Sequence, residues 1–81
     1  MIDMRKAIEL AKERNDNYNA VQEYADAYEF FVDDGEIREG GGDCSTIIEK
    51  SSGKILRWNE YFMDSSRTIV EIGGAKHLDE I

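Results

Sequence analysis

An apolar stripe at helical spacing near the start of the chain restricts the fold more than any other feature. Four apolar residues recur at i, i+3, i+4 and i+7, which is the spacing of one helix face: Met4, Ala7, Ile8 and Ala11. Asp3 stands at a capping position, and Arg14-Asn15 offers a basic last turn followed by a stop. The pattern predicts an amphipathic helix from Asp3 to about Arg14, whose apolar face must pack on the rest of the chain.

The next segment favours β-structure. The run Tyr-Glu-Phe-Phe-Val is aromatic and β-branched, and it stops at Asp33-Asp34-Gly35, a turn signal. We therefore expect strands over Val21–Asp26 and Ala27–Val32. The alanines and glutamates of this region leave one long helix over 20–31 as the rival interpretation. Residues 33–43 are polar and glycine-rich, and they predict a long loop.

The second half predicts another hairpin. Cys44–Glu49 is an apolar strand, and Ser51-Ser52-Gly53 is a tight turn that returns the chain as a strand over Lys54–Trp58. Asn59 is placed to cap a short helix over 60–63. Residues 68–72 fit a strand or a helix, with Gly73-Gly74 expected to end the element and the tail expected to be short helix or frayed coil.

These elements predict a single α+β domain over residues 1–81. The N-terminal helix packs on an antiparallel sheet of three to four strands, in a two-layer sandwich. A chain of 81 residues supports only a thin core, so a deep substrate cavity is hard to accommodate. Because the chain has no proline and few safeguards on its sheet edges, an edge strand could pair with a second copy, although nothing in the sequence requires a homodimer.

Negative charge is concentrated in the middle of the chain. The net charge is −8, from 10 basic and 18 acidic residues, and residues 15–49 carry ten of the acids against Arg38 alone. Such a field repels nucleic acids and anionic membranes, and it attracts basic proteins. An acidic surface also keeps a small protein in solution. The charge is explained equally well by either role.

Catalytic and metal-binding motifs find little support. Cys44 and His77 are the only Cys and His, they stand 33 residues apart, and no motif supplies an oxyanion hole. A calcium loop starting at Asp33 would need glycine at its sixth position, where Arg38 stands. The glycines 40–42 lack the Lys-Ser/Thr of a phosphate-binding loop. We expect a protein that is not an enzyme and needs no cofactor or metal.

The same sequence predicts a cytoplasmic protein that does not enter membranes. No apolar run approaches the ~18 residues of a membrane span, and the first residues lack the apolar core of a signal peptide. A single cysteine suits a reducing compartment.

Aromatic residues beside acids predict a protein-binding surface. Strand alternation places Tyr28 and Phe30 on one face and Phe31 on the other, so aromatic surface stays open unless the C-terminal segment covers it. In such a surface carboxylates orient a basic partner and aromatic side chains hold it. The candidate contact residues are Tyr28, Glu29, Asp33, Asp34, Glu36, Glu39, Asp43 and Trp58.

The span from Tyr24 to about Phe62 resembles a family of small bacterial proteins. The likeness rests on an aromatic strand, a glycine loop, an apolar strand, a Lys-x-x-Gly-Lys turn and a final aromatic group: Asp26-Ala27-Tyr28-Glu29-Phe30-Phe31, Gly41-Gly42-Asp43, Thr46-Ile47-Ile48, Glu49-Lys50-Ser51-Ser52-Gly53-Lys54, Trp58 and Tyr61-Phe62. Behind an N-terminal helix, this order resembles the immunity protein 35 family. The resemblance implies a non-enzymatic antidote that neutralises a toxin by binding it.

The interpretation favoured by the sequence is therefore an acidic binding protein with a basic protein partner, such as a toxin. A phage-type or regulatory inhibitor that imitates nucleic-acid charge is the alternative. A small enzyme that uses Cys44 and an accessory domain without independent activity also remain open.

Overall fold

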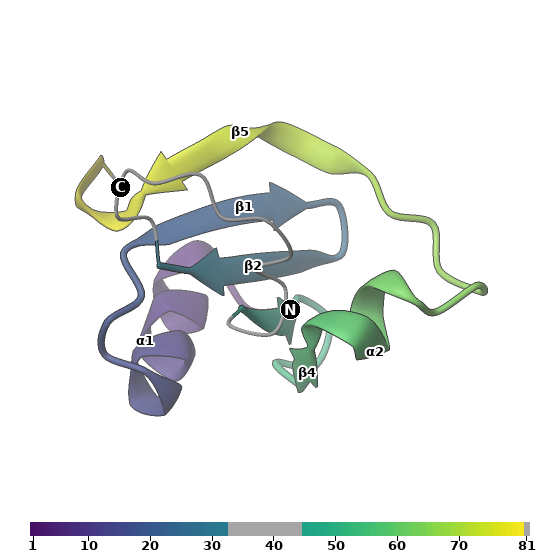
Figure 1. Ribbon diagram of the computed structural model, residues 1–81, viewed down its shortest axis with the longest axis horizontal. Helices are drawn as coiled ribbons and strands as arrows, with labels where there is room; N and C mark the ends of the chain where they lie inside the picture. Colours follow the sequence, from purple (N-terminus) through teal and green to yellow (C-terminus); the bar gives the residue numbers. More distant parts are fainter. Residues whose placement is uncertain (33–44, 81) are drawn as a thin grey trace.

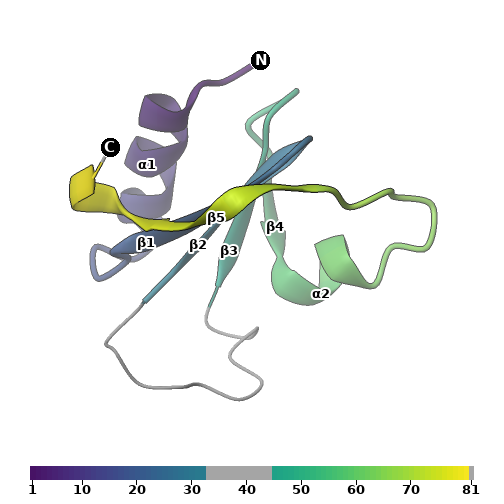
Figure 2. The ribbon, with the colours of Figure 1, turned by 90° about the horizontal axis from the view of Figure 1, so that it is seen from above.

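The computed structural model describes residues 1–32 and 45–80. Five antiparallel strands form one sheet in the order β4-β3-β2-β1-β5, and a helix lies against each face (Figures 1 and 2). The predicted α+β class is confirmed, with one strand more than the upper estimate. The strands are β1 (Ala20–Tyr24), β2 (Ala27–Phe31), β3 (Thr46–Glu49), β4 (Ile55–Arg57) and β5 (Glu71–His77).

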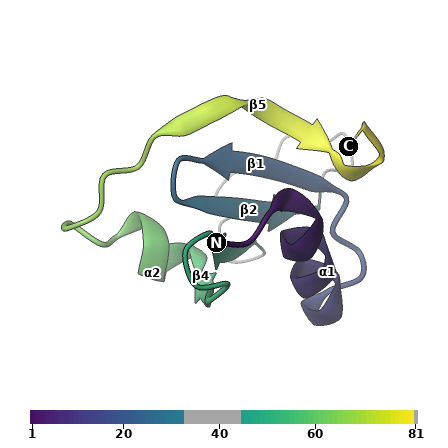
Figure 3. The ribbon, with the colours of Figure 1, turned by 180° about the vertical axis from the view of Figure 1, so that it is seen from behind.

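Helix α1 (Met4–Arg14) forms as its apolar spacing predicts. The Asp3 side chain accepts a hydrogen bond of 2.9 Å from the Lys6 backbone N–H, and the helix ends at Asn15. Ala7 and Ala11 are fully buried, and their small side chains let the helix lie close to the sheet (Figure 3). The sheet side of this contact is the face to which Val21, Tyr28, Phe30 and Ile48 point.

Both predicted hairpins are present, and the rival helix over 20–31 is wrong. Strands β1 and β2 pair with Val21 opposite Phe30, and β3 and β4 pair with Ile47 opposite Leu56. At the β3–β4 turn Gly53 adopts φ +72°, and its N–H donates to the Glu49 carbonyl at 2.8 Å. That backbone conformation favours glycine, which explains why Ser51-Ser52-Gly53 predicts a tight turn at this position.

The C-terminal part differs from expectation in two places. Helix α2 (Trp58–Phe62) follows β4 directly with Arg57 at its cap, so Asn59 is not the cap residue. Strand β5 runs through Gly73-Gly74 instead of ending there. A bulge at Gly73, with φ +68°, absorbs a register shift against β1, and the Gln22 amide donates to the Gly73 carbonyl at 3.0 Å. A short 3-10 helix, Leu78–Glu80, follows.

The sheet is covered on both faces, which gives the protein two core clusters. Beyond the α1 side, a second cluster joins sheet residues Tyr24, Ala27, Ile47 and Leu56 to Tyr61 of α2. Figure 2 shows α1 and α2 on opposite sides of the sheet. The second cluster adds a partial third layer to the expected sandwich, and it covers aromatic surface that the sequence left open.

Candidate functional site

Of the eight candidate contact residues, the three that the structure describes do not share one surface. Five of them, Asp33, Asp34, Glu36, Glu39 and Asp43, lie outside the described residues, as does Cys44. Tyr28 is 6% exposed on the α1 face, with the Lys50 ammonium 4.8 Å from its ring centroid. Burial raises the pKa of its hydroxyl. Tyr28 therefore belongs to the core and offers no surface to a partner.

Glu29 and Trp58 lie on the opposite, α2 side of the sheet, joined through aromatic rings. The Tyr24 hydroxyl donates to Glu29 Oε1 at 3.0 Å, and the rings of Tyr24 and Phe62 are 5.6 Å apart. The Phe62 ring in turn lies 5.0 Å from Trp58. These contacts connect an acid and an aromatic candidate across one continuous part of the α2 side.

On the same side, at the end of the sheet formed by the β1–β2 turn and the end of β3, lies Arg67, which the sequence analysis did not single out. Its Nη1 is 2.8 Å from Asp26 Oδ2 and its Nη2 is 3.3 Å from Glu49 Oε2. The guanidinium stacks 4.7 Å from the centroid of the Tyr61 ring, and the Tyr61 hydroxyl donates to Asp26 Oδ1. These contacts fasten the segment after α2 to the β1–β2 turn and to β3.

Arg67 was missed because its partners are far away in the sequence. Asp26 is 41 residues distant, and no local pattern links the two. The one available signal is that Arg67 is the single basic residue between Trp58 and Gly74. A lone cation among acids and aromatics marks a residue with a structural partner elsewhere, but it does not identify that partner.

Three carboxylates that lie within 4 Å of Arg67 and two more that lie near Tyr24 define what we call the acidic face. Its members come from the β1–β2 turn, β2, β3, the segment after α2, and β5: Asp26, Glu29, Glu49, Asp64 and Glu71. With one guanidinium against five carboxylates, the face carries an excess of four negative charges. Glu71 belongs to the acidic face because it stands opposite Tyr24 in the β1–β5 ladder.

The protonation of this face follows from its hydrogen bonds. Hydrogen bonds from Ser52, then Arg67 and Ser51, hold the pKa of Glu49 below its ordinary value against the opposing effect of burial. Hydrogen bonds from the side chain and backbone of Ser66 lower the pKa of Asp64. Burial, reinforced by Glu29 for Tyr24 and by Asp26 for Tyr61, raises the pKa of both phenols far above 10, so each stays a hydrogen-bond donor.

Strand β5 presents a second accessible feature, an open sheet edge. All seven of its residues are exposed, and among the described strands it is paired with β1 alone. Val70 and Ile72 are 50% and 46% exposed beside this edge. His77, at the end of β5, pairs with Ala20 in the ladder. An exposed edge with apolar residues is a template for pairing with another strand.

Within residues 1–32 and 45–80, no group of three or more His, Cys, Asp or Glu side chains is arranged to hold a metal ion. None of the helices in that part of the chain has the length and apolar character needed to cross a membrane.

Comparison of the chain with protein-family models, with curated proteins and with solved structures finds no match. The resemblance to the immunity protein 35 family therefore stays a prediction from the sequence. Fold and site together define a small α+β protein with an acidic sheet face bordered by aromatic rings.

Proposed function

We propose that this chain is a non-enzymatic cytoplasmic binding protein of the immunity type, which neutralises a basic partner protein by covering it. The observation that carries the proposal is the acidic face, where five carboxylates exceed one guanidinium by four charges and lie next to Tyr24, whose ring contacts that of Phe62. Carboxylates of this kind accelerate encounter with a basic surface, and adjacent aromatic rings supply the buried contact.

Preorganisation supports the same proposal. Glu29 is held by the Tyr24 hydroxyl, and Glu49 is held by Ser51, Ser52 and Arg67. Side chains that are already ordered lose less entropy on binding than free ones. A basic partner would therefore meet carboxylates whose positions are fixed, which favours recognition over mere solubility.

The first experiment is affinity capture from a lysate of the source organism, at low salt and at about 0.5 M salt. The captured protein is then purified, and its activity is measured with and without an equimolar amount of this chain. Loss of that activity supports neutralisation, and a fully active complex would contradict it. Competition by DNA or RNA for the same partner would favour the alternative, an inhibitor that imitates nucleic-acid charge.

A matched pair of variants tests the acidic face itself. Glu29→Gln with Glu71→Gln removes two charges from the face while preserving an acceptor for the Tyr24 hydroxyl. The association rate with the captured partner is expected to fall about three- to tenfold at low salt. Glu13→Gln with Asp16→Asn makes the same charge change at exposed positions in and after α1, and it should leave the rate nearly unchanged. Equal effects in both pairs would show that only net charge matters.

We also propose that β5 pairs with β5 of a second copy. An antiparallel pairing centred on Gly74 places Glu71 opposite the second copy's His77 and Ile72 opposite its Lys76. The acidic end of each strand then meets the basic end of the other. Light scattering behind size exclusion is expected to detect a dimer whose dissociation constant rises at least about tenfold in Ile72→Lys, which faces two lysines toward each other. Val70→Lys, outside the strand, is the control, and a monomer at all concentrations would refute the pairing.

A further inference from the structure

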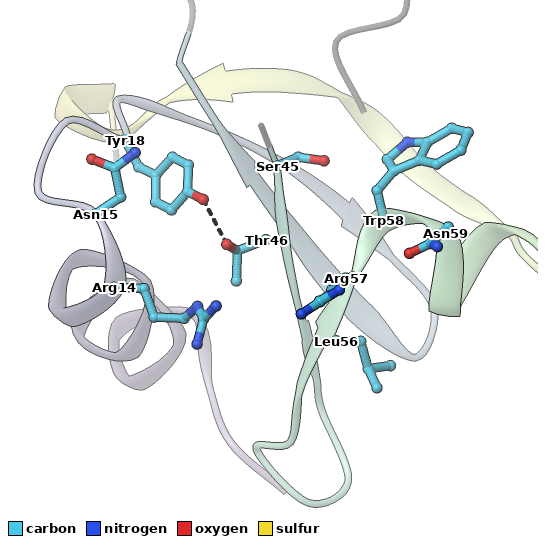
Figure 4. A pocket seen from close by; sticks show the side chains of 9 residues that line it. All are labelled: Arg14, Asn15, Tyr18, Ser45, Thr46, Leu56, Arg57, Trp58 and Asn59. Atoms are coloured by element: carbon cyan, nitrogen blue, oxygen red, sulfur yellow. Dashed lines mark hydrogen bonds between the residues drawn. The ribbon is translucent and has the colours of Figure 1, made fainter. Parts of the chain in front are cut away.

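A polar hollow lies at the β4 edge of the sheet, away from Arg67. Its volume is about 620 Å³, and it opens between the end of α1, the start of β3 and the β4–α2 junction (Figure 4). Among the described residues that line it none is acidic, although the chain has 18 acids. The described residues that line the hollow therefore carry a net positive charge.

Two arginines give the hollow this charge. Arg14 belongs to the last turn of α1 and Arg57 to the end of β4, and Figure 4 shows both side chains extending from opposite walls into the same space. Neither guanidinium forms an ion pair within the described part of the chain, whereas Arg67 and Lys50 are both paired with carboxylates there. Two such guanidiniums facing one cavity repel each other, and an anion between them relieves that repulsion.

The other walls supply neutral polar groups and one aromatic ring. Tyr18 and Thr46 share a hydrogen bond of 2.5 Å between their hydroxyls, which fixes two oxygen atoms at the inner wall. Asn15 and Asn59 line opposite sides, and the partly buried Trp58 lines the part next to Asn59, where Figure 4 shows its ring turned away from the two arginine side chains. Hydroxyls and amides suit the polar part of a ligand, and an indole suits a flat ring.

We propose that this hollow binds a small organic phosphate that carries an aromatic ring, about the size of a mononucleotide. Each arginine presents a planar fork of N–H donors that matches phosphate oxygens, and the two forks extend from opposite walls of the hollow. The volume lies within the range of small-molecule sites. The overall charge of −8 disfavours any anion at long range, so the binding depends on the contacts within the hollow.

The test is a nuclear magnetic resonance titration of the whole chain with AMP, and separately with adenosine and with inorganic phosphate. AMP is expected to give saturable shifts of the Trp58 indole N–H and the Thr46 amide, with tighter binding than either half of the molecule. Arg14→Gln with Arg57→Gln is expected to weaken AMP binding about ten- to a hundredfold. Both side chains are exposed, so the fold should survive, and circular dichroism checks it.

The control is Lys12→Gln with Lys54→Gln, which removes the same charge at exposed positions that do not line the hollow. Its affinity for AMP should match that of the unmodified chain. Three results would overturn the proposal: no saturable shift up to about 20 mM AMP, an equal loss of affinity in the lysine control, or equal affinity for adenosine and AMP. The last result would leave the arginines without a role.

Discussion

Replacing Tyr61 with alanine is expected to leave the protein unfolded or close to unfolding at room temperature. Tyr61 is fully buried, and its ring lies 5.6 Å from Tyr24 and 5.0 Å from Phe62. Truncating a buried aromatic side chain costs about 3–5 kcal/mol, which approaches the whole stability of a domain this small. Urea unfolding followed by circular dichroism measures the effect as a loss in the free energy of unfolding.

Tyr61→Phe separates the ring from the hydroxyl. This variant keeps the ring contacts and loses only the hydrogen bond to Asp26, so a cost of about 1–2 kcal/mol is expected. If Tyr61→Ala were no less stable than Tyr61→Phe, the α2-side cluster would contribute nothing to folding. That result would contradict the packing described above.

Replacing Arg67 with methionine is expected to cost about 2–3 kcal/mol, because Asp26 and Glu49 lose their common partner. The side chains of these two acids are 39% and 22% exposed, so water screens part of the loss and the full value for a buried pair does not apply. Arg5→Met, on the exposed side of α1, is the matched control and should change stability little. Adding Asp26→Asn and Glu49→Gln to Arg67→Met should recover much of the loss, because the two acids closest to the guanidinium are then neutral and only Asp64, 3.7 Å from Arg67 Nε, loses a charged partner.

The pH dependence of stability provides a second test of the contacts around Arg67. The folded-state pKa of Glu49 is lowered, so its contribution to stability is complete above the unfolded pKa of about 4.3 and is lost as the pH falls through the lowered folded value. Arg67 is one cause of that lowering, after Ser52. The stability difference between the unmodified chain and Arg67→Met should therefore narrow when the pH is lowered from about 7 to about 3. A difference that does not change with pH would mean that Arg67 acts through packing alone.

The elements that local chemistry specifies were predictable from the sequence. Asp3 caps α1, the apolar stripe sets its buried face, and Gly53 sets the β3–β4 turn. Strand β5 was not predictable in this way. All its residues are exposed, so no alternation marks it, and Gly73-Gly74 carries an intrinsic penalty of about 0.5–1 kcal/mol per glycine that only pairing with β1 offsets.

For the candidate site, the sequence predicted the kinds of residue better than it predicted which residues lie together. Glu29 and Trp58 lie on one side of the sheet, linked through the rings of Tyr24 and Phe62. Tyr28 does not join them, because neighbouring residues of a strand point to opposite faces, and its own face is covered by α1. The Arg67 contacts lay beyond reach because they depend on how distant segments fold back together.

The order of strands also determines when the sheet can be completed. Strand β1 lies between β2, its immediate successor in the chain, and β5, and 47 residues separate Tyr24 from its ladder partner Glu71. During synthesis, the first hairpin is made before β5, so one edge of β1 stays unpaired until β5 has been made and released. The last strand to emerge therefore closes the contact of longest range, and this step should limit how fast the newly made chain reaches its native state.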